Sequence, residues 1–132
     1  MRMAIAATLA LLSFPALAAS PDCSKAAASP SSECKAKLDY CHYTSITLVL
    51  AFRHRLDGKT EDAALAPGKT DPIWYVKNRD VVKDIVHRVY TNESFYQKMK
   101  AQIDPSAMGM ARATSALIQG CNADTKVTVE SH

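Results

Sequence analysis

The sequence predicts an all-α fold, a compact bundle of four or five helices held together by two disulfides. Three observations lead to this expectation. Apolar residues recur at steps of three and four, helix caps and breakers separate these stretches, and the four cysteines form an even set. The Val127-Thr128-Val129 run has β-like composition, but it is too short to make a sheet alone.

The first eighteen residues have the organisation of a secretory signal peptide. Arg2 supplies a positive charge, Met3 to Phe14 form an apolar run, and Ala16-Leu17-Ala18 is a small-x-small cleavage site. The apolar run is shorter than the roughly 20 residues that span a bilayer, and no second span is expected downstream. We therefore expect residues 1–18 to be removed, and the mature protein to be periplasmic or secreted.

Removal of residues 1–18 from the 132-residue chain leaves 114 residues, a common size for one domain. Arg2 is the only charged residue that is lost, so 15 of the 16 Lys and Arg remain against 13 Asp and Glu, a net charge of +2. This balance does not favour a nucleic-acid partner, which usually requires a basic stripe. The expected organisation is an N-terminal arm over 19–31, a helical domain over 32–121 and a flexible tail over 122–132.

The first long helix is predicted from about Ser32 to Leu56, with Ser29-Pro30 as its cap and Asp57-Gly58 as its stop. One face of this helix carries Cys34, Leu38, Cys41, Ser45, Leu48, Phe52 and Leu56. A short helix over 61–66 follows, capped by Thr60 and ended by Pro67-Gly68.

Three further helices are expected. Asp71-Pro72 opens one, re-capped at Asp80, with an apolar set made of Trp74, Val81, Val82, Ile85, Val86, Val89 and Tyr90. Thr91-Asn92 separates it from a helix that presents Phe95, Met99 and Ile103. Asp104-Pro105 caps the last helix, which is expected to run to about Gly120 and to place Met108, Leu117 and Ile118 in the core.

An even number of cysteines in an exported chain implies two disulfides. If Cys34 and Cys41 share one helix, their Cα atoms are roughly 10 Å apart, beyond the roughly 7 Å that a disulfide can bridge. This leaves two pairings. The favoured one is Cys23–Cys34 with Cys41–Cys121, which joins the arm to the first helix and the first helix to the last. The pairing Cys23–Cys41 with Cys34–Cys121 stays open.

Two regions are candidates for binding a protein partner. Tyr43, Thr47, Leu50 and His54 form a second side of the first helix, beside Tyr40, which suits either a central helix or a partner surface. The same helix ends in Arg53, His54 and Arg55, which suit the helix dipole, although an arginine fork could also grip a carboxylate. The second region is the 59–74 segment, in which Lys59, Lys69 and Trp74 are candidate contacts and Trp74 could instead fill the core.

The sequence contains no recognised catalytic, nucleotide-binding or zinc-site motif. Asp80, Asp84 and His87 share one helix face and could hold a metal, but neighbouring Lys77, Lys83 and Arg88 favour simple ion pairs. We therefore expect a protein that is not an enzyme and has no metal or cofactor.

Several features together resemble a group of small exported helical bacterial proteins. They are the early cysteines Cys34 and Cys41, the Arg53 to Lys59 helix end, the Val81 to Tyr90 helix and the late Cys121. The general build is similar to periplasmic immunity proteins of the Rap/Tai kind, which protect bacteria from peptidoglycan amidases delivered by type VI secretion. The resemblance implies a helical fold and a toxin hydrolase as partner.

The leading expectation is therefore a periplasmic binding protein, specifically an immunity protein that inhibits a secreted toxin hydrolase through the 59–74 segment. The alternative is a periplasmic stress protein or acid-responsive chaperone, in which His42, His54 and His87 gain charge as the pH falls. A third hypothesis is a homodimer formed through Tyr40, Tyr43, Leu50 and His54.

Overall fold

The computed structural model describes residues 20–25, 29–127 and 129, and six α-helices lie within that part of the chain. They are α1 (Ser32–Leu56), α2 (Glu61–Leu65), α3 (Ile73–Lys77), α4 (Arg79–Thr91), α5 (Glu93–Gln102) and α6 (Ala107–Ala123). The expected all-α fold with two disulfides is confirmed, with six helices in place of four or five. The expected signal peptide, residues 1–18, lies outside the described residues, as do parts of the arm and tail.

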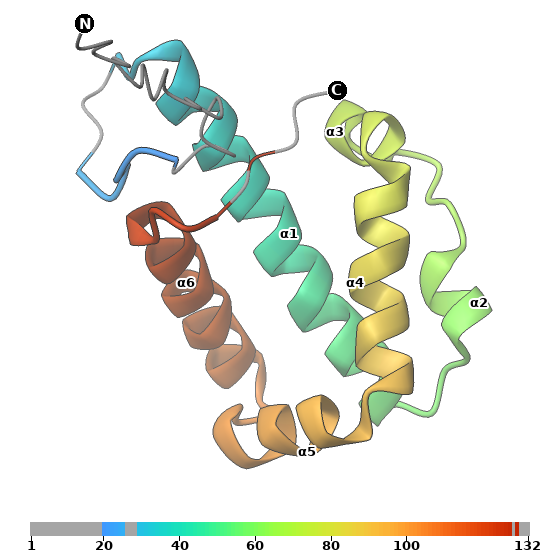
Figure 1. Cartoon of the computed structure of the whole chain (residues 1–132). Helices are drawn as coiled ribbons and strands as arrows, with labels where there is room; N and C mark the ends of the chain where they lie inside the picture. The colour runs from blue at the N-terminus through green and yellow to red at the C-terminus, as the bar shows by residue number, and fades with distance from the viewer. Residues whose placement is uncertain (1–19, 26–28, 128, 130–132) are drawn as a thin grey trace, which may run out of the picture.

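Helix α1 is the centre of the molecule. It packs against α4 on one side and α6 on the other, while α5 joins the lower ends of these two helices (Figure 1). The predicted bounds of α1 are confirmed, but its cap is Ser31, whose hydroxyl accepts a hydrogen bond from the amide of Cys34 at 3.3 Å. The helix ends at Leu56, and Gly58, two residues later, turns the chain with a φ of +76°, a conformation that glycine adopts without strain.

The helix expected to start at Asp71-Pro72 is split in two. The break falls at Asn78, which has φ −114° and ψ 36° and lies between α3 and α4, so the expected re-capping at Asp80 is wrong. The buried Asn78 side chain donates to the carbonyl of Trp74 at 2.8 Å and therefore satisfies the end of α3. Thr60 caps helix α2, as expected, because its hydroxyl accepts a hydrogen bond from the amide of Ala63.

The cap of helix α6 lies two residues later in the chain than predicted. Ser106, not Asp104, caps it by accepting from the amide of Gly109 at 3.0 Å. Asp104 supports this turn, and hydrogen bonds from the Ser106 backbone and hydroxyl lower the pKa of the Asp104 carboxyl. A Cβ on Gly109 would lie 2.3 Å from the Asp104 carbonyl oxygen, so this contact requires glycine.

The main core lies where α1, α4 and α5 meet. Its buried members are Ala51, Phe52, Val82, Val86, Val89, Tyr96 and Met99. Complete burial of a side chain such as Phe52 or Val89 contributes roughly 1.5–3 kcal/mol to the free energy of unfolding. Met108, expected in the core, is instead 65% exposed, so this prediction is wrong.

Two disulfides connect α1 covalently to neighbouring segments of the chain. Cys23–Cys34 joins the N-terminal arm to α1, and Cys41–Cys121 joins α1 to α6 across a separation of 80 residues. The favoured cysteine pairing is therefore confirmed.

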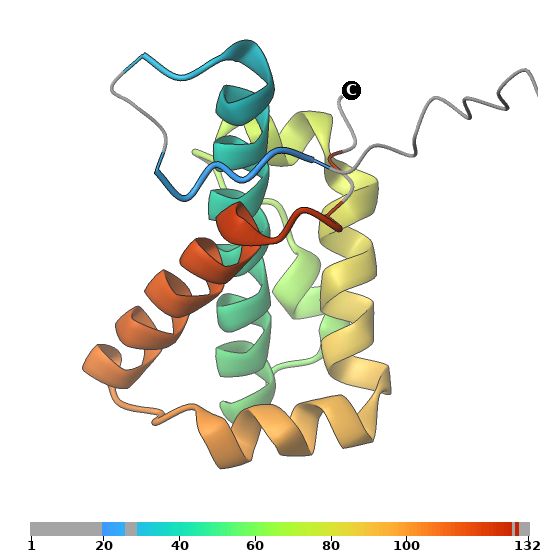
Figure 2. The ribbon, with the colours of Figure 1, turned by 60° about the vertical axis from the view of Figure 1, so that its left-hand side comes forward.

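A buried lysine adds a second connection between the two ends of the described chain. Lys37 of α1 is 0% exposed, and its ammonium donates to the carbonyls of Pro21 at 2.6 Å and Asp124 at 2.7 Å. The arm also donates from the amide of Cys23 to the carbonyl of Asn122 at 2.8 Å. Figure 2 shows the arm and the end of α6 crossing the first half of α1 side by side.

The described residues contain no helix that is both long and apolar enough to cross a membrane.

Candidate protein-binding face

The two regions that the sequence offers separately form one surface. The loop between α1 and α3 turns back along α1, so that Thr47, Leu50 and His54 line a cavity of about 230 Å³. The opposite walls come from the loop and from α4, and Tyr75 of α3 lies at the same cavity. The second side of α1 and the 59–74 segment therefore face each other.

Aromatic rings join α3 to α1 at one end of this surface. Tyr43 and Trp74 stack, with ring centroids 5.2 Å apart and an angle of 17° between the planes. Tyr75 meets the edge of Tyr43 at 5.4 Å, and Tyr40 meets Trp74 at 6.2 Å. We call Tyr40, Tyr43, Trp74 and Tyr75 the aromatic cluster. Trp74 is half-buried and helps to fill the interior, as one of the two sequence hypotheses expected.

Two large exposed apolar side chains flank Trp74 and Tyr75 in α3, and a third lines the same cavity as Tyr75. Ile73 is 73% exposed, Val76 is 69% exposed, and Leu50 of α1 is 50% exposed. Such residues in a continuous set are typical of protein-binding sites, whereas single ones are ordinary surface features. We call these three residues, together with Tyr43, His54 and Trp74, the binding face.

The loop beside the binding face is tied to α4 at three points. The hydroxyl of Tyr90 donates to the carbonyl of Lys59 at 2.8 Å, and His87 contacts the Glu61 carboxylate at 2.8 Å. The third contact is a hydrogen bond from the Arg79 guanidinium to the carbonyl of Leu65. These contacts hold the loop in one arrangement.

The cationic side chains of the loop lie at its surface. Lys59 and Lys69 are both exposed, one before α2 and the other after it. The amide of Gly68 donates to the Asp71 carboxylate at 3.0 Å, which closes the turn that carries Lys69. Both lysines are therefore available to acidic groups of a partner.

His54 occupies an unusual position in the cavity. Its Nδ1 atom is buried and has no hydrogen-bond partner among the residues that the structure describes. Burial lowers the pKa of His54 below its usual value, and the nearby Lys59 cation adds to this effect, while Asp57 opposes it. The ring is therefore neutral at pH 7.

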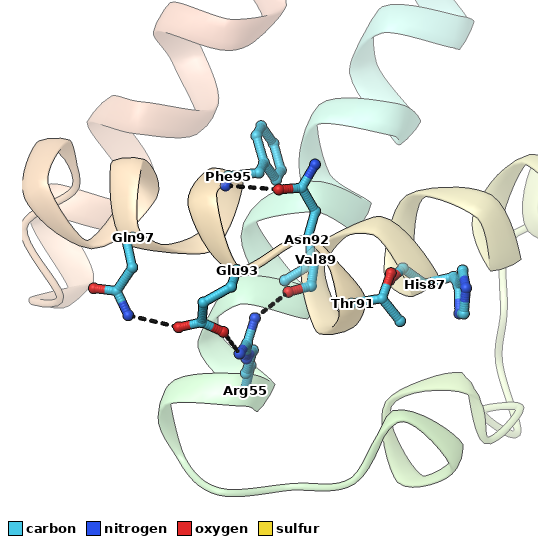
Figure 3. Close-up of polar contacts among 8 residues, drawn as sticks. All are labelled: Arg55, His87, Val89, Thr91, Asn92, Glu93, Phe95 and Gln97. Carbon is cyan, nitrogen blue, oxygen red and sulfur yellow. Dashed lines mark hydrogen bonds and ion pairs between the residues drawn. The ribbon is translucent and has the colours of Figure 1, made fainter.

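Arg55, a candidate partner contact in the sequence, is used inside the molecule (Figure 3). Its guanidinium donates to the carbonyl of Val89 at 2.7 Å, pairs with the Glu93 carboxylate, and lies 3.7 Å from the ring centroid of Tyr96. Hydrogen bonds from Gln97 and from Arg55 lower the pKa of Glu93. Arg55 therefore fastens the end of α1 to the corner between α4 and α5, away from the aromatic cluster.

The face of α4 that carries Asp80, Asp84 and His87 forms no metal site with other described residues. His87 turns to Glu61 of α2, and no group of three or more His, Cys, Asp or Glu in the described ranges could hold a metal ion. Sequence spacing gave no sign of the contact between Glu61 and His87, because it joins residues of two helices.

The exposure of Ile73 and Val76 is the feature of the site that sequence analysis missed. The signal was present in the Ile-Trp-Tyr-Val-Lys composition of α3, a five-residue helix directly after Pro72. Such a short helix can place only part of its surface against its neighbours, so an apolar sequence leaves some of these side chains in water. No known protein family, curated protein or solved structure matches this chain.

Proposed function

We propose that this chain is an exported, non-enzymatic protein-binding protein, and specifically an immunity protein that inhibits a secreted toxin hydrolase. The observation that carries the proposal is the exposure of Ile73, Val76 and Leu50 beside the aromatic cluster. Interfaces derive most of their binding free energy from a few such anchors near the centre of the contact.

The rigidity of the surface supports high affinity. The Tyr43–Trp74 stack and the three loop contacts with α4 order the binding face before any partner arrives. A preordered surface loses little conformational entropy on binding, which is one way in which protein inhibitors become tight. Lys59 and Lys69 at the edge would contribute orientation and association rate, since exposed charges act mainly on these.

Capture of a partner tests the function. Oxidised protein of residues 19–132 is immobilised and exposed to an extract of its own organism, and proteins retained at high salt are identified by mass spectrometry. The proposal expects one stoichiometric hydrolase, whose digestion of peptidoglycan stops when one equivalent of this protein is added. A retained protein with no hydrolase activity, or a hydrolase whose activity is unaffected, contradicts the immunity function.

One observation favours a second function, the acid-responsive chaperone. His54 carries a buried, unpartnered Nδ1, whereas His42 and His87 are exposed, so His54 is the histidine through which acid could loosen the helices. This function requires new apolar surface at mild acidity. A hydrophobic dye should then bind as the pH falls from 7 to about 4, and an unchanged dye signal rules the function out.

A further inference from the structure

A groove lies between α4 and α6, whereas the α2 part of the 59–74 segment lies on the other side of α4 (Figure 1). Figures 1 and 2 show α4 and α6 standing apart on either side of α1, with α5 across one end. The space between them is a groove of about 570 Å³ with Leu48 at its floor. Val81 and Ile85 of α4 form one wall, Ala116 and Gly120 of α6 form the other, and Phe95 closes the α5 end. Asp124 and Val127, which follow α6, line the groove at its other end, so the open part of the groove lies between this segment and α5.

One side of α6 is exposed to solvent but carries almost no charged side chains. Met108, Arg112, Ala116 and Gly120 follow one another at four-residue spacing and are all exposed. Arg112 is the only charged residue among the 17 of α6, whereas the 13 residues of α4 include five charged ones besides His87. A helix side that is both exposed and nearly uncharged is typical of an interface.

Ala116 and Gly120 belong both to the wall of the groove and to this exposed side of α6. A second copy of the chain can therefore cover both features at once. We propose that two copies of this chain associate about a two-fold axis, with α6 of each copy lying in the groove of the other. One isologous contact of this kind fills both grooves and covers both exposed α6 sides. A Cβ on Gly120 would meet no atom of the described residues within 4 Å, so none of them fills the space directly in front of α6 at this position.

Charge supports the same arrangement. Asp84 lies in the α4 wall of the groove, and neither it nor Arg112 forms an ion pair with another described residue. Arg112 lies close enough to Asp104 of its own chain to help lower the pKa of that carboxyl, and in the dimer it would also meet Asp84 of the other copy, once on each side of the axis. Arg88 lies one turn from Asp84 on the same wall and would face the uncharged remainder of the incoming helix.

Sedimentation equilibrium of oxidised residues 19–132 tests the dimer. Wild type is expected to be dimeric at micromolar concentration. Gly120→Glu places a charge in the groove mouth without a clash inside one copy, and glutamate is a better helix former than glycine, so the monomer keeps its fold. We expect this variant to weaken the dimer at least about tenfold while its unfolding midpoint stays equal to or above that of wild-type monomer.

A charge exchange gives the second arm of the test. Asp84→Arg and Arg112→Asp should each weaken the dimer about tenfold, and the double variant should restore most of the loss. Ala101→Glu, on an exposed position of α5, is the control and should leave the dimer unchanged. A wild type that is monomeric up to about 1 mM overturns the proposal. So does a dimer that resists Gly120→Glu or that dissociates on Ile73→Glu instead. The proposal is independent of the immunity function, because it concerns a different face.

Discussion

The indole ring of Trp74 lies nearly parallel to the phenol ring of Tyr43, 5.2 Å away. This contact joins residues 31 positions apart in the chain and fixes α3 against the second side of α1. It is the reason that the loop and the α1 side form one binding face. Loss of either ring should therefore affect both the stability of this corner and the shape that a partner meets.

The Tyr43–Trp74 stack should be measurable as a coupling energy. We expect Tyr43→Ala and Trp74→Ala to be non-additive by about 1 kcal/mol in the free energy of unfolding, the usual value for an aromatic pair. Urea denaturation of the wild type, both single variants and the double variant provides the cycle. Phe95→Ala is the matched control, because α5 and α3 lie at opposite ends of α4 (Figure 1), and its effect should add to that of Trp74→Ala. A coupling near zero for Tyr43 and Trp74 would mean that the rings are neighbours without a stabilising contact.

Lys37 should be among the most sensitive charged residues of the molecule. Lys37→Met keeps the apolar stem but removes the ammonium that donates to the carbonyls of Pro21 and Asp124, and the Asp124 carbonyl then keeps only the long 3.4 Å bond from the Ser20 hydroxyl. We expect the free energy of unfolding to fall by about 3 kcal/mol, since unsatisfied buried polar groups cost about 1–3 kcal/mol each. Lys35→Met, at an exposed position of the same helix, should change it by less than about 0.5 kcal/mol. Equal effects in urea denaturation would show that burial of the Lys37 ammonium contributes nothing.

The two disulfides should differ in their contributions to stability. The chain-entropy model gives about 4.5 kcal/mol for the 80-residue separation of Cys41–Cys121 and about 3 kcal/mol for the 11-residue separation of Cys23–Cys34. Replacement of each pair by alanine should therefore lower the unfolding midpoint more for Cys41–Cys121. Calorimetry under identical conditions makes the comparison. The reverse order would indicate that the contacts of the arm, including those of Lys37, depend strongly on Cys23–Cys34.

The buried ring of His54 makes stability depend on pH. Its pKa in the folded protein lies below 6.5, so as the pH falls below about 6.5 the unfolded chain takes up a proton that the folded chain resists. The free energy of unfolding should decrease over this range. Lys59 and Asp57 act on the ring directly, and Arg79 and Asp71 line the same cavity.

A substitution isolates this contribution. His54→Phe replaces the ionisable imidazole by an apolar ring and breaks no hydrogen bond at Nδ1 with a described residue, so the stability of this variant should change less than that of the wild type between pH 7 and pH 5. His42→Phe alters an exposed histidine and should follow the wild-type pH curve. Urea denaturation at several pH values gives the comparison. Parallel curves for the wild type and His54→Phe would remove His54 as the source of the acid response.

Local signals in the sequence were sufficient for the first helix and reduced the possible cysteine pairings to two, of which the structure confirms the favoured one. The spacing of apolar residues from Ser32 to Leu56 is regular over seven turns, and the length of that helix excludes a Cys34–Cys41 bond. Helix ends were less predictable, because Asp104 and Ser106 both suit a cap and only the packing of Gly109 against Asp104 decides between them.

Features that depend on distant segments left no local signal. The partners of Lys37 are carbonyls 16 and 87 positions away, and nothing near Lys37 in the sequence distinguishes it from Lys35. Met108 was placed in the core because apolar residues usually lie inside, but the rotation of α6 is set by Cys121 and by the contacts of α1. The packing of the 59–74 segment against the Tyr43 side of α1 likewise joins distant residues and is visible only in the tertiary structure.

The binding face is proposed to make the contact with the partner. The affinity of the captured hydrolase for two matched variants tests this directly. Calorimetric titration is made with Ile73→Glu/Val76→Glu, which places charge at the centre of the face, and with the control Ala101→Glu on α5. Each substitution is at an exposed position and should leave the fold intact. The account predicts a loss of at least about 100-fold in affinity for the double variant and no change for the control. Equal affinity for wild type and both variants would contradict the account and place the partner contact elsewhere on the molecule.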